Sequence, residues 1–179
     1  MSPITLIAIA LVFLPMVAEA RRAAANERTQ LARGGIEPRG DVYRVMQYAY
    51  PAAFLAMIAE GAWRGDARFV ETGAALFIVA KTLKWWAILS LGEAWTFRVI
   101  TVPGAMLVRS GPYRWLRHPN YVAVVGELAG VALLTGARVT GPVATCAFGL
   151  LMLKRIAVEN RALGDILAPA QSPQRHHRA

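Results

Sequence analysis

Long, mostly apolar stretches with few or no charged side chains recur along this chain and constrain its fold more than any other feature. They lie at residues 1–18, 45–59, 72–91, 121–134 and 139–153. An α-helix rises about 1.5 Å per residue, so that about 20 apolar residues cross the hydrocarbon core of a bilayer, which is about 30 Å thick. The pattern therefore predicts an all-α, polytopic membrane protein with about five transmembrane helices.

The overall composition agrees with a lipid environment. Hydrophobic residues make up 56% of the 179-residue chain and charged residues 17%, against about 45–50% and about 25% in soluble domains. A chain of this length has too little interior to bury so much apolar surface away from water. The composition therefore excludes a disordered chain, a coiled coil and an ordinary soluble enzyme, and it favours a single membrane-embedded domain over residues 1–179.

The basic residues are distributed asymmetrically between the predicted loops. The chain has 20 Lys and Arg against 11 Asp and Glu, which gives a formal net charge of +9. With the N-terminus outside, 15 of the 18 Lys and Arg in loops and tails lie on the inner side, and only Arg64, Arg68 and Arg138 lie on the outer side. Because positively charged loops stay in the cytoplasm, we expect the N-terminus outside and the C-terminus in the cytoplasm. This topology explains the basic excess without a nucleic-acid partner.

The first stretch has an alternative interpretation as a secretory signal peptide, because residues 18–20 (Ala-Glu-Ala) fit a cleavage site. A signal peptide starts with basic residues, whereas Arg21 and Arg22 follow this stretch instead of preceding it. We therefore expect a membrane helix over residues 1–18, with a polar loop over residues 21–44 that is helical at most at its start.

The last two stretches are separated only by residues 135–138. So short a connection predicts an antiparallel helical hairpin. Gly126 and Gly130 form a GxxxG pattern, which lets another backbone approach closely.

Three charged residues interrupt the apolar stretches, namely Lys81, Lys84 and Glu127. An acidic side chain inside a membrane is costly unless it is paired. We therefore expect Lys81 or Lys84 to neutralise Glu127, and we expect this part of the third stretch to face protein, water or headgroups.

The segment from residue 107 to residue 121 (LVRSGPYRWLRHPNY) combines basic, aromatic and turn-forming residues, which is unusual for a simple connection. Gly111 and Pro112 predict a turn, and Pro119 suits the first turn of a helix. One interpretation is a loop that only anchors the protein to lipid headgroups. The other is a ligand site on the cytoplasmic face.

The order of residues around Pro119 supports the ligand site. His118, Asn120 and Tyr121 would surround the N-terminus of the following helix, where backbone N–H groups favour an anionic group. Tyr113 and Trp115 would be available to stack on a flat ring. His118 has no second His or Cys at ligand spacing, so the sequence predicts no metal site.

A second polar cluster follows the hairpin. Arg155 and Glu159 are four residues apart and therefore lie on one face of a helix. They would form either a surface ion pair of small energetic value or part of a site. The hairpin returns this helix end to the membrane face that carries His118, so the two clusters can share a pocket. Arg155 would then hold an anionic substrate, and Glu159 would accept hydrogen bonds from a ligand.

Together these residues resemble the isoprenylcysteine carboxyl methyltransferase family of integral-membrane methyltransferases, which is close to the phospholipid methyltransferases. The similarity extends over residues 86–163, and it depends on Gly111-Pro112-Tyr113, Arg117-His118-Pro119-Asn120-Tyr121, Arg155, Glu159, Asn160 and Leu163. The resemblance implies that S-adenosylmethionine is bound by Ala105, Met106, Leu107, Val108, Tyr113, His118, Pro119, Asn120, Tyr121 and Glu159. It also implies that Arg155 faces the substrate as a catalytic residue.

The leading hypothesis is therefore a cofactor-dependent methyl transfer to a lipophilic acceptor at the membrane, with a prenylated substrate as the first candidate. A lipidic phenol and the amine of a phospholipid headgroup are alternative acceptors. A non-enzymatic membrane subunit or a transporter is the alternative from another class, but a transporter would place its polar residues at mid-membrane. We expect residues 1–85 to supply N-terminal helices, residues 86–163 the methyltransferase core and residues 164–179 a flexible tail.

Overall fold

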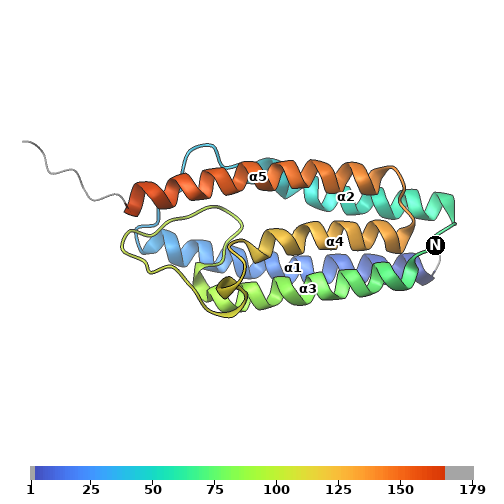
Figure 1. The fold of residues 1–179 in the computed structure, drawn as a ribbon, viewed down its shortest axis with the longest axis horizontal. Helices are drawn as coiled ribbons and strands as arrows, with labels where there is room; N and C mark the ends of the chain where they lie inside the picture. The colour runs from blue at the N-terminus through green and yellow to red at the C-terminus, as the bar shows by residue number, and fades with distance from the viewer. Residues whose placement is uncertain (1–2, 168–179) are drawn as a thin grey trace, which may run out of the picture.

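Five α-helices account for most of residues 3–167, the part of the chain that this computed structural model describes (Figure 1). They are α1 (Pro3–Ala32), α2 (Tyr43–Arg64), α3 (Val70–Leu91), α4 (Pro119–Thr135) and α5 (Thr140–Leu167). Two 3₁₀ helices, η1 (Gly92–Ala94) and η2 (Gly111–Arg114), lie in the long connection between α3 and α4. Residues 3–167 contain no β-strand, so the all-α prediction is confirmed. Most of the predicted tail lies outside the described residues.

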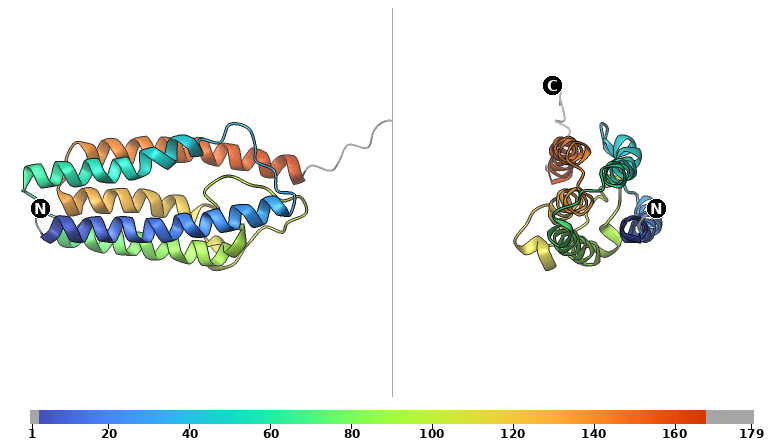
Figure 2. Two further views of the ribbon diagram at one scale, coloured as in Figure 1. Left: turned by 180° about the vertical axis from the view of Figure 1, so that it is seen from behind. Right: turned by 90° about the vertical axis from the view of Figure 1, so that its right-hand side faces the viewer.

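The helices lie side by side along the long axis of the molecule, and α4 occupies the centre (Figure 2). It packs against α2, α3 and α5. Leu128 and Val131 of α4 are fully buried and share one core cluster with Phe54 of α2, Phe77 of α3 and Met152 of α5. The predicted hairpin of the last two helices is confirmed, because a short connection joins α4 to α5.

Glycines bring α3 and α4 into close contact. A Cβ atom built on Gly130 would lie 2.7 Å from the backbone nitrogen of Phe77, and one built on Gly126 would lie 2.9 Å from the Cβ of Ala80. Both distances are too short for a real side chain. The GxxxG pattern in α4 therefore acts as the sequence suggests, by letting a neighbouring backbone approach.

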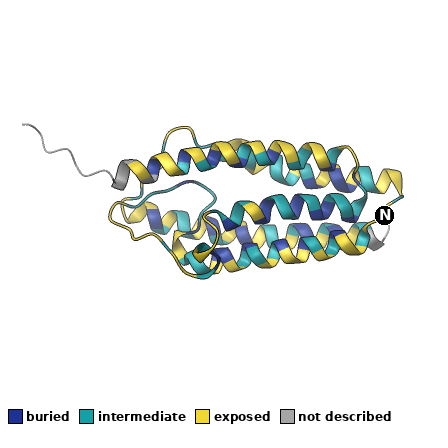
Figure 3. Ribbon diagram, viewed as in Figure 1, coloured by how far each residue is buried: buried dark blue, intermediate teal, exposed yellow. Residues whose placement is uncertain are grey.

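Figure 3 shows that exposed residues line the outer faces of the bundle, and many of them are apolar. Examples are Leu14 of α1, Leu55 of α2, Val79 of α3 and Leu150 of α5. Within residues 3–167, two segments are long and apolar enough to cross a membrane, Val70–Ala94 and Thr140–Ala162, and α4 is apolar but shorter. Five membrane crossings therefore stay a prediction.

Four charged side chains meet in the interior of the bundle. The Nζ atom of Lys81 lies 3.0 Å from Glu19 Oε1 and 2.8 Å from Glu127 Oε1, and Nζ of Lys84 lies 2.7 Å from Glu19 Oε2 and 3.3 Å from Glu127 Oε2. The Tyr50 hydroxyl donates a further hydrogen bond to Glu127. We call Glu19, Lys81, Lys84 and Glu127 the ion network. The expected pairing of Glu127 is confirmed for both lysines.

The ion network also revises the expectation for the N-terminal region. Glu19, which the signal-peptide alternative places at a cleavage site, is 1% exposed and belongs to the ion network. The predicted polar loop begins only after Ala32, because residues 21–32 continue α1. This half of the helix also makes hydrogen bonds with a distant segment. Asn26 Nδ2 donates to the carbonyl oxygens of Gly92 at 3.0 Å and Trp95 at 2.7 Å. These hydrogen bonds hold the segment that follows α3 against α1.

At the opposite end of the bundle, Glu60 of α2 caps the start of α5. Its carboxylate accepts hydrogen bonds from the backbone N–H groups of Arg138, Val139 and Thr140 and from the Thr140 hydroxyl, at 2.7–3.1 Å. These bonds, above all those from Thr140, lower the pKa of Glu60 to about 2. Glu60 therefore stays ionised and ties α2 to the α4–α5 hairpin.

The close contact of α3 and α4 can be tested with two alanine variants. We expect Gly130→Ala to destabilise the protein by about 1–3 kcal/mol, the usual cost of overpacking a tight contact. Gly149→Ala in α5 is the matched control, because a Cβ at Gly149 meets nothing within 4 Å and alanine favours a helix by up to about 1 kcal/mol. The measurement is the melting temperature of each variant in detergent. Equal melting temperatures for the two variants would contradict the close contact at Gly130.

Candidate functional site

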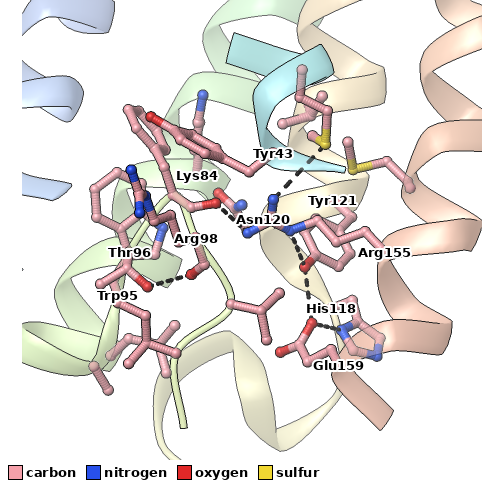
Figure 4. A pocket seen from close by; sticks show the side chains of 18 of the residues that line it. Tyr43, Lys84, Trp95, Thr96, Arg98, His118, Asn120, Tyr121, Arg155 and Glu159 are labelled. Atoms are coloured by element: carbon pink, nitrogen blue, oxygen red, sulfur yellow. Dashed lines mark hydrogen bonds and ion pairs between the residues drawn. The ribbon is translucent and has the colours of Figure 1, made fainter. Parts of the chain in front are cut away.

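A cavity of about 1030 Å³ lies at the end of the bundle where α4 begins and α5 ends. All five helices contribute to its wall, together with the segment after α3 and the loop that leads into α4 (Figure 4). Small-molecule sites usually occupy about 300–1,000 Å³. The cavity therefore lies at the upper end of this range.

Four side chains from the two predicted motifs form one connected cluster in this wall (Figure 4). The Tyr121 hydroxyl donates to Glu159 Oε2 at 2.8 Å and accepts from Arg155 Nε at 3.0 Å. The His118 ring stacks on the Tyr121 ring with a centroid distance of 5.3 Å, and His118 Nδ1 lies 3.6 Å from Glu159 Oε2. The hairpin thus brings the start of α4 and the end of α5 to the same cavity, as the spacing of the motifs predicts.

The guanidinium of Arg155 bonds within the protein through all three of its nitrogen atoms. In addition to the bond from Nε to Tyr121, one terminal nitrogen lies 3.4 Å from Asp41 Oδ1 and the other donates to the carbonyl oxygen of Phe97. Only 6% of the side chain is exposed. Arg155 therefore links α5 to α4, to the start of α2 and to the segment after α3. Its predicted contact with a substrate stays a prediction, and the geometry favours a positioning role.

Asp41 is a site-forming residue that the sequence analysis missed. Its Oδ1 accepts a hydrogen bond from the Tyr43 backbone N–H at 3.1 Å, and its Oδ2 accepts one from the Val99 backbone N–H at 2.9 Å. An Asp just before an apolar run is a signal for a helix start, so the first contact had a local signal. Val99 and Arg155 lie 58 and 114 residues further along the chain, and nothing in the sequence indicated those contacts.

The turn before α4 directs Tyr113 to the cavity. Gly111 has a φ of +58°, and a Cβ at this position would collide with the Ser90 side chain, so only glycine fits. Pro112 is buried in η2, and Tyr113 borders the cavity. Burial raises the pKa of Tyr113, and the nearby Glu159 raises it further. The Tyr113 phenol therefore stays protonated and can donate a hydrogen bond.

Most of the predicted site residues border the cavity: Leu107, Val108, Tyr113, His118, Asn120, Tyr121, Arg155 and Glu159. Ala105 and Met106 are exposed and do not border it, and Met106 is 94% exposed. Pro119 is buried as the first residue of α4. Trp115, expected to stack on a ligand, packs against Trp86 with a ring centroid distance of 5.9 Å. Among the described residues, no group of three or more His, Cys, Asp or Glu could hold a metal ion.

The first two helices supply a wall that the motifs did not predict. Met16 and Ala20 of α1 and Met46, Tyr50 and Pro51 of α2 border the cavity. Their pattern in the sequence is that of ordinary apolar helices, so no local signal distinguishes them from residues that face lipid. This wall is mostly apolar, which suits a hydrocarbon chain.

The comparison with known families bears directly on this arrangement. The model of the isoprenylcysteine carboxyl methyltransferase (ICMT) family matches residues 73–165, which is more than half of the chain. The chain belongs to this family. The resemblance inferred from the sequence is thereby confirmed, and the matched region of this ICMT-family protein contains every predicted site residue.

Two relatives are similar over most of their length. The uncharacterized protein YpbQ of Bacillus subtilis (strain 168) is 31% identical over 166 residues, which cover 88% of this chain and 95% of that protein. An uncharacterized protein of Haemophilus influenzae is 28% identical over 145 residues, which cover 79% of this chain and 84% of that protein. No solved structure matches the ICMT-family chain significantly.

The role of Arg155 in the ICMT-family site can be tested by Arg155→Lys. Lysine keeps the positive charge but cannot make all of the guanidinium contacts, and each lost hydrogen bond costs about 0.5–1.5 kcal/mol. We therefore expect this variant to lower the free energy of unfolding by about 1–3 kcal/mol. Lys154→Met, at the exposed neighbouring position, is the control and should have almost no effect. The measurement is denaturant unfolding in detergent.

An alternative outcome would identify Arg155 as a residue that aligns the acceptor. In that case Arg155→Lys would leave stability and cofactor affinity near the wild-type values and would lower kcat/KM by about 10- to 100-fold. That result would contradict the positioning role.

Proposed function

We propose that this protein transfers a methyl group from S-adenosylmethionine to a lipophilic acceptor at the membrane, and that the reaction most resembles the carboxyl O-methylation of an isoprenylated cysteine. The observation that supports this proposal is the convergence of two motifs, around His118 and around Glu159, on one large cavity. The chain belongs to a methyltransferase family, which supplies the reaction class.

The groups in the cavity wall fit the polar parts of S-adenosylmethionine. Glu159 offers a carboxylate to hydroxyl and amino groups, and the Tyr113 phenol offers a donor. The Oδ1 atom of Asn120 is buried and has no hydrogen-bond partner among the described residues, which suits a ligand donor. The first turn of α4 has no side-chain cap, so that a carboxylate is favoured there. His118 and Tyr121 add stacked rings.

We therefore propose that the cofactor is held by those predicted residues that border the cavity: Leu107, Val108, Tyr113, His118, Asn120, Tyr121 and Glu159. When it is bound, S-adenosylmethionine supplies a methyl group on a positively charged sulfur, which is activated for transfer. Arg155 would act by holding Tyr121 and the segment around Phe97 in place.

The demands on the protein depend on the acceptor. A carboxylate is ionised at neutral pH, so that its methylation requires alignment and the exclusion of water more than a base. The apolar side chains of Met46, Val124 and Met152 border the cavity and would exclude water. A phenol or an amine would have to lose a proton, and His118 or Glu159 would then serve as the general base.

The decisive experiment is a methyl-transfer assay with purified protein in detergent and radiolabelled S-adenosylmethionine. Three acceptors represent the alternatives: N-acetyl-S-farnesylcysteine for a carboxylate, a long-chain alkylphenol for a phenol and phosphatidylethanolamine for an amine. We expect transfer to the carboxylate. Absence of both cofactor binding and transfer to any acceptor would favour a non-enzymatic subunit or a transporter.

The cofactor site can be tested by single substitutions. We expect His118→Ala and Tyr121→Ala each to weaken S-adenosylmethionine binding at least ~10-fold, or about 1.4 kcal/mol, because each removes one stacking or hydrogen-bonding group. Trp115→Ala is the matched control, since it removes an aromatic side chain from the same loop that does not border the cavity. Calorimetric titration provides the affinities. Equal affinity in all three folded variants and the wild type would refute the cofactor site.

We also propose that the five helices all cross the membrane, with the cavity at the cytoplasmic face and the N-terminus outside. The structure places the two ends of the bundle far apart (Figure 1). The end with the cavity carries Arg109, Arg114 and Arg117, whereas the other end carries Arg64, Arg68 and Arg138 as its basic loop residues. The cytoplasmic side is the more basic one in membrane proteins.

This topology predicts the labelling of single cysteines in intact cells. The native Cys146 is exposed and would first be replaced by serine. Arg68→Cys lies at the outer end and should react with a membrane-impermeant maleimide. Ser110→Cys lies at the cavity end and should react only after the cells are permeabilised. The reverse pattern would show that the proposed orientation is wrong.

A further inference from the structure

The ion network meets the cavity at one of its two lysines. Lys84 borders the cavity, as does Tyr50, whose ring lies 5.2 Å from Lys84 Nζ. Lys81 makes equivalent ion pairs with Glu19 and Glu127, but it does not border the cavity. The two lysines are therefore alike in the ion network and differ in their access to a ligand.

Lys84 retains an unused hydrogen-bond donor. An ammonium group has three N–H donors. Among the described residues, the acceptors of Lys84 Nζ are Glu19 Oε2 at 2.7 Å and Glu127 Oε2 at 3.3 Å. The third N–H group has no oxygen or nitrogen acceptor among these residues, in a side chain that is only 3% exposed, and the nearest ring centroid, that of Tyr50, lies 5.2 Å from Nζ. A charged donor in surroundings from which water is excluded bonds strongly to an anionic oxygen.

The charge of the cavity wall favours an anionic ligand at this place. The charged residues that border the cavity are Lys84, Arg98, Arg109, Arg114, Arg117 and Arg155 as cations, and Glu27 and Glu159 as anions. Glu159 lies at the opposite end of the group of side chains from Lys84 (Figure 4). A positively charged cofactor beside Glu159 and an anion beside Lys84 would therefore each meet a complementary charge.

We propose that Lys84 forms a second polar subsite at the inner end of the cavity, and that this subsite binds an anionic oxygen of the methyl acceptor. The inference rests on the proposed function, because it assumes that the acceptor shares the cavity with the cofactor. Glu19 and Glu127 hold the ammonium group in position and leave its third N–H group free to donate a hydrogen bond. An acceptor group without an anionic oxygen would gain no charge-assisted hydrogen bond from Lys84, so the subsite favours acceptors that carry such an oxygen.

The test compares two matched double variants. Lys84→Met with Glu19→Gln and Lys81→Met with Glu19→Gln each remove one lysine and one carboxylate charge from the ion network. The probe is N-acetyl-S-farnesylcysteine, and its uncharged carboxamide analogue is the control ligand. Equilibrium binding is measured with S-adenosylhomocysteine present, so that no methyl transfer occurs. S-adenosylmethionine affinity is measured separately for each protein.

We expect the Lys84 double variant to weaken binding of the carboxylate probe at least ~10-fold, and the Lys81 double variant to change it by less than ~2-fold. Cofactor affinity should stay the same in both. The carboxamide should bind the wild type and the Lys84 variant equally. If the methionine variants do not fold, Lys84→Arg and Lys81→Arg provide the same comparison, and only Lys84→Arg should change the affinity for the carboxylate probe.

Three results would overturn the subsite. If the two lysine variants weakened binding of the carboxylate probe equally, Lys84 would have only a structural role in its ion pairs. Equally tight binding of carboxylate and carboxamide by the wild type would remove the anionic specificity. Binding of S-adenosylmethionine without any binding of the carboxylate probe would refute the subsite and leave the proposed cofactor site intact, whereas a wild type that binds no cofactor would refute the proposed function itself.

Discussion

An unpaired charge in the interior of a helical bundle costs several kcal/mol, so buried charges are tolerated only where opposite charges meet them with good geometry. This requirement applies to the ion network, in which Lys81 and Lys84 of α3 both contact Glu19 of α1 and Glu127 of α4. Since the partners lie on different helices, few combinations of helix rotation and depth satisfy all four contacts. The network therefore sets the register of α1, α3 and α4, and Tyr50 extends it to α2.

The cavity depends on this register and on a second buried charge. Arg155 joins α5 to Tyr121, Asp41 and Phe97, which belong to three other parts of the chain. The polar groups at the start of α4 are thus held between two sets of charged contacts, one in the middle of the bundle and one at its end. A rigid frame of this kind suits a reaction that requires the alignment of two bound molecules more than proton transfer.

The sequence predicted the features that depend on local patterns. Apolar stretches predicted the helices, four connecting residues predicted the hairpin, and the hairpin in turn placed Arg155 and Glu159 beside His118. Each of these inferences needs only the helix period or a short loop. The close contact at the glycines of α4 followed from the GxxxG spacing, and the pairing of Glu127 followed from the cost of an unpaired charge.

The features that the sequence did not predict depend on contacts between distant residues. The second half of α1 carries Asn26, which donates hydrogen bonds to backbone oxygens of the segment after α3. Asp41 and Glu19 gave only weak local signals, and each obtained its role from partners far along the chain. The apolar wall from α1 and α2 was missed because residues that face a cavity and residues that face lipid have the same composition.

The cap that Glu60 provides for α5 has a consequence for the synthesis of the protein. Residues of α2 leave the ribosome long before those of α5. The Glu60 carboxylate therefore lacks its hydrogen-bond donors at the start of α5 while α3 and α4 are synthesised. The end of the bundle opposite the cavity closes only when Thr140 and its two preceding residues have been synthesised. The Arg155 contacts lie further along the same helix and must form after that. The cavity is therefore among the last parts of the molecule to be completed. A chain that stops short of Arg155 would still have the Glu60 cap at the opposite end of the bundle but would lack a formed site.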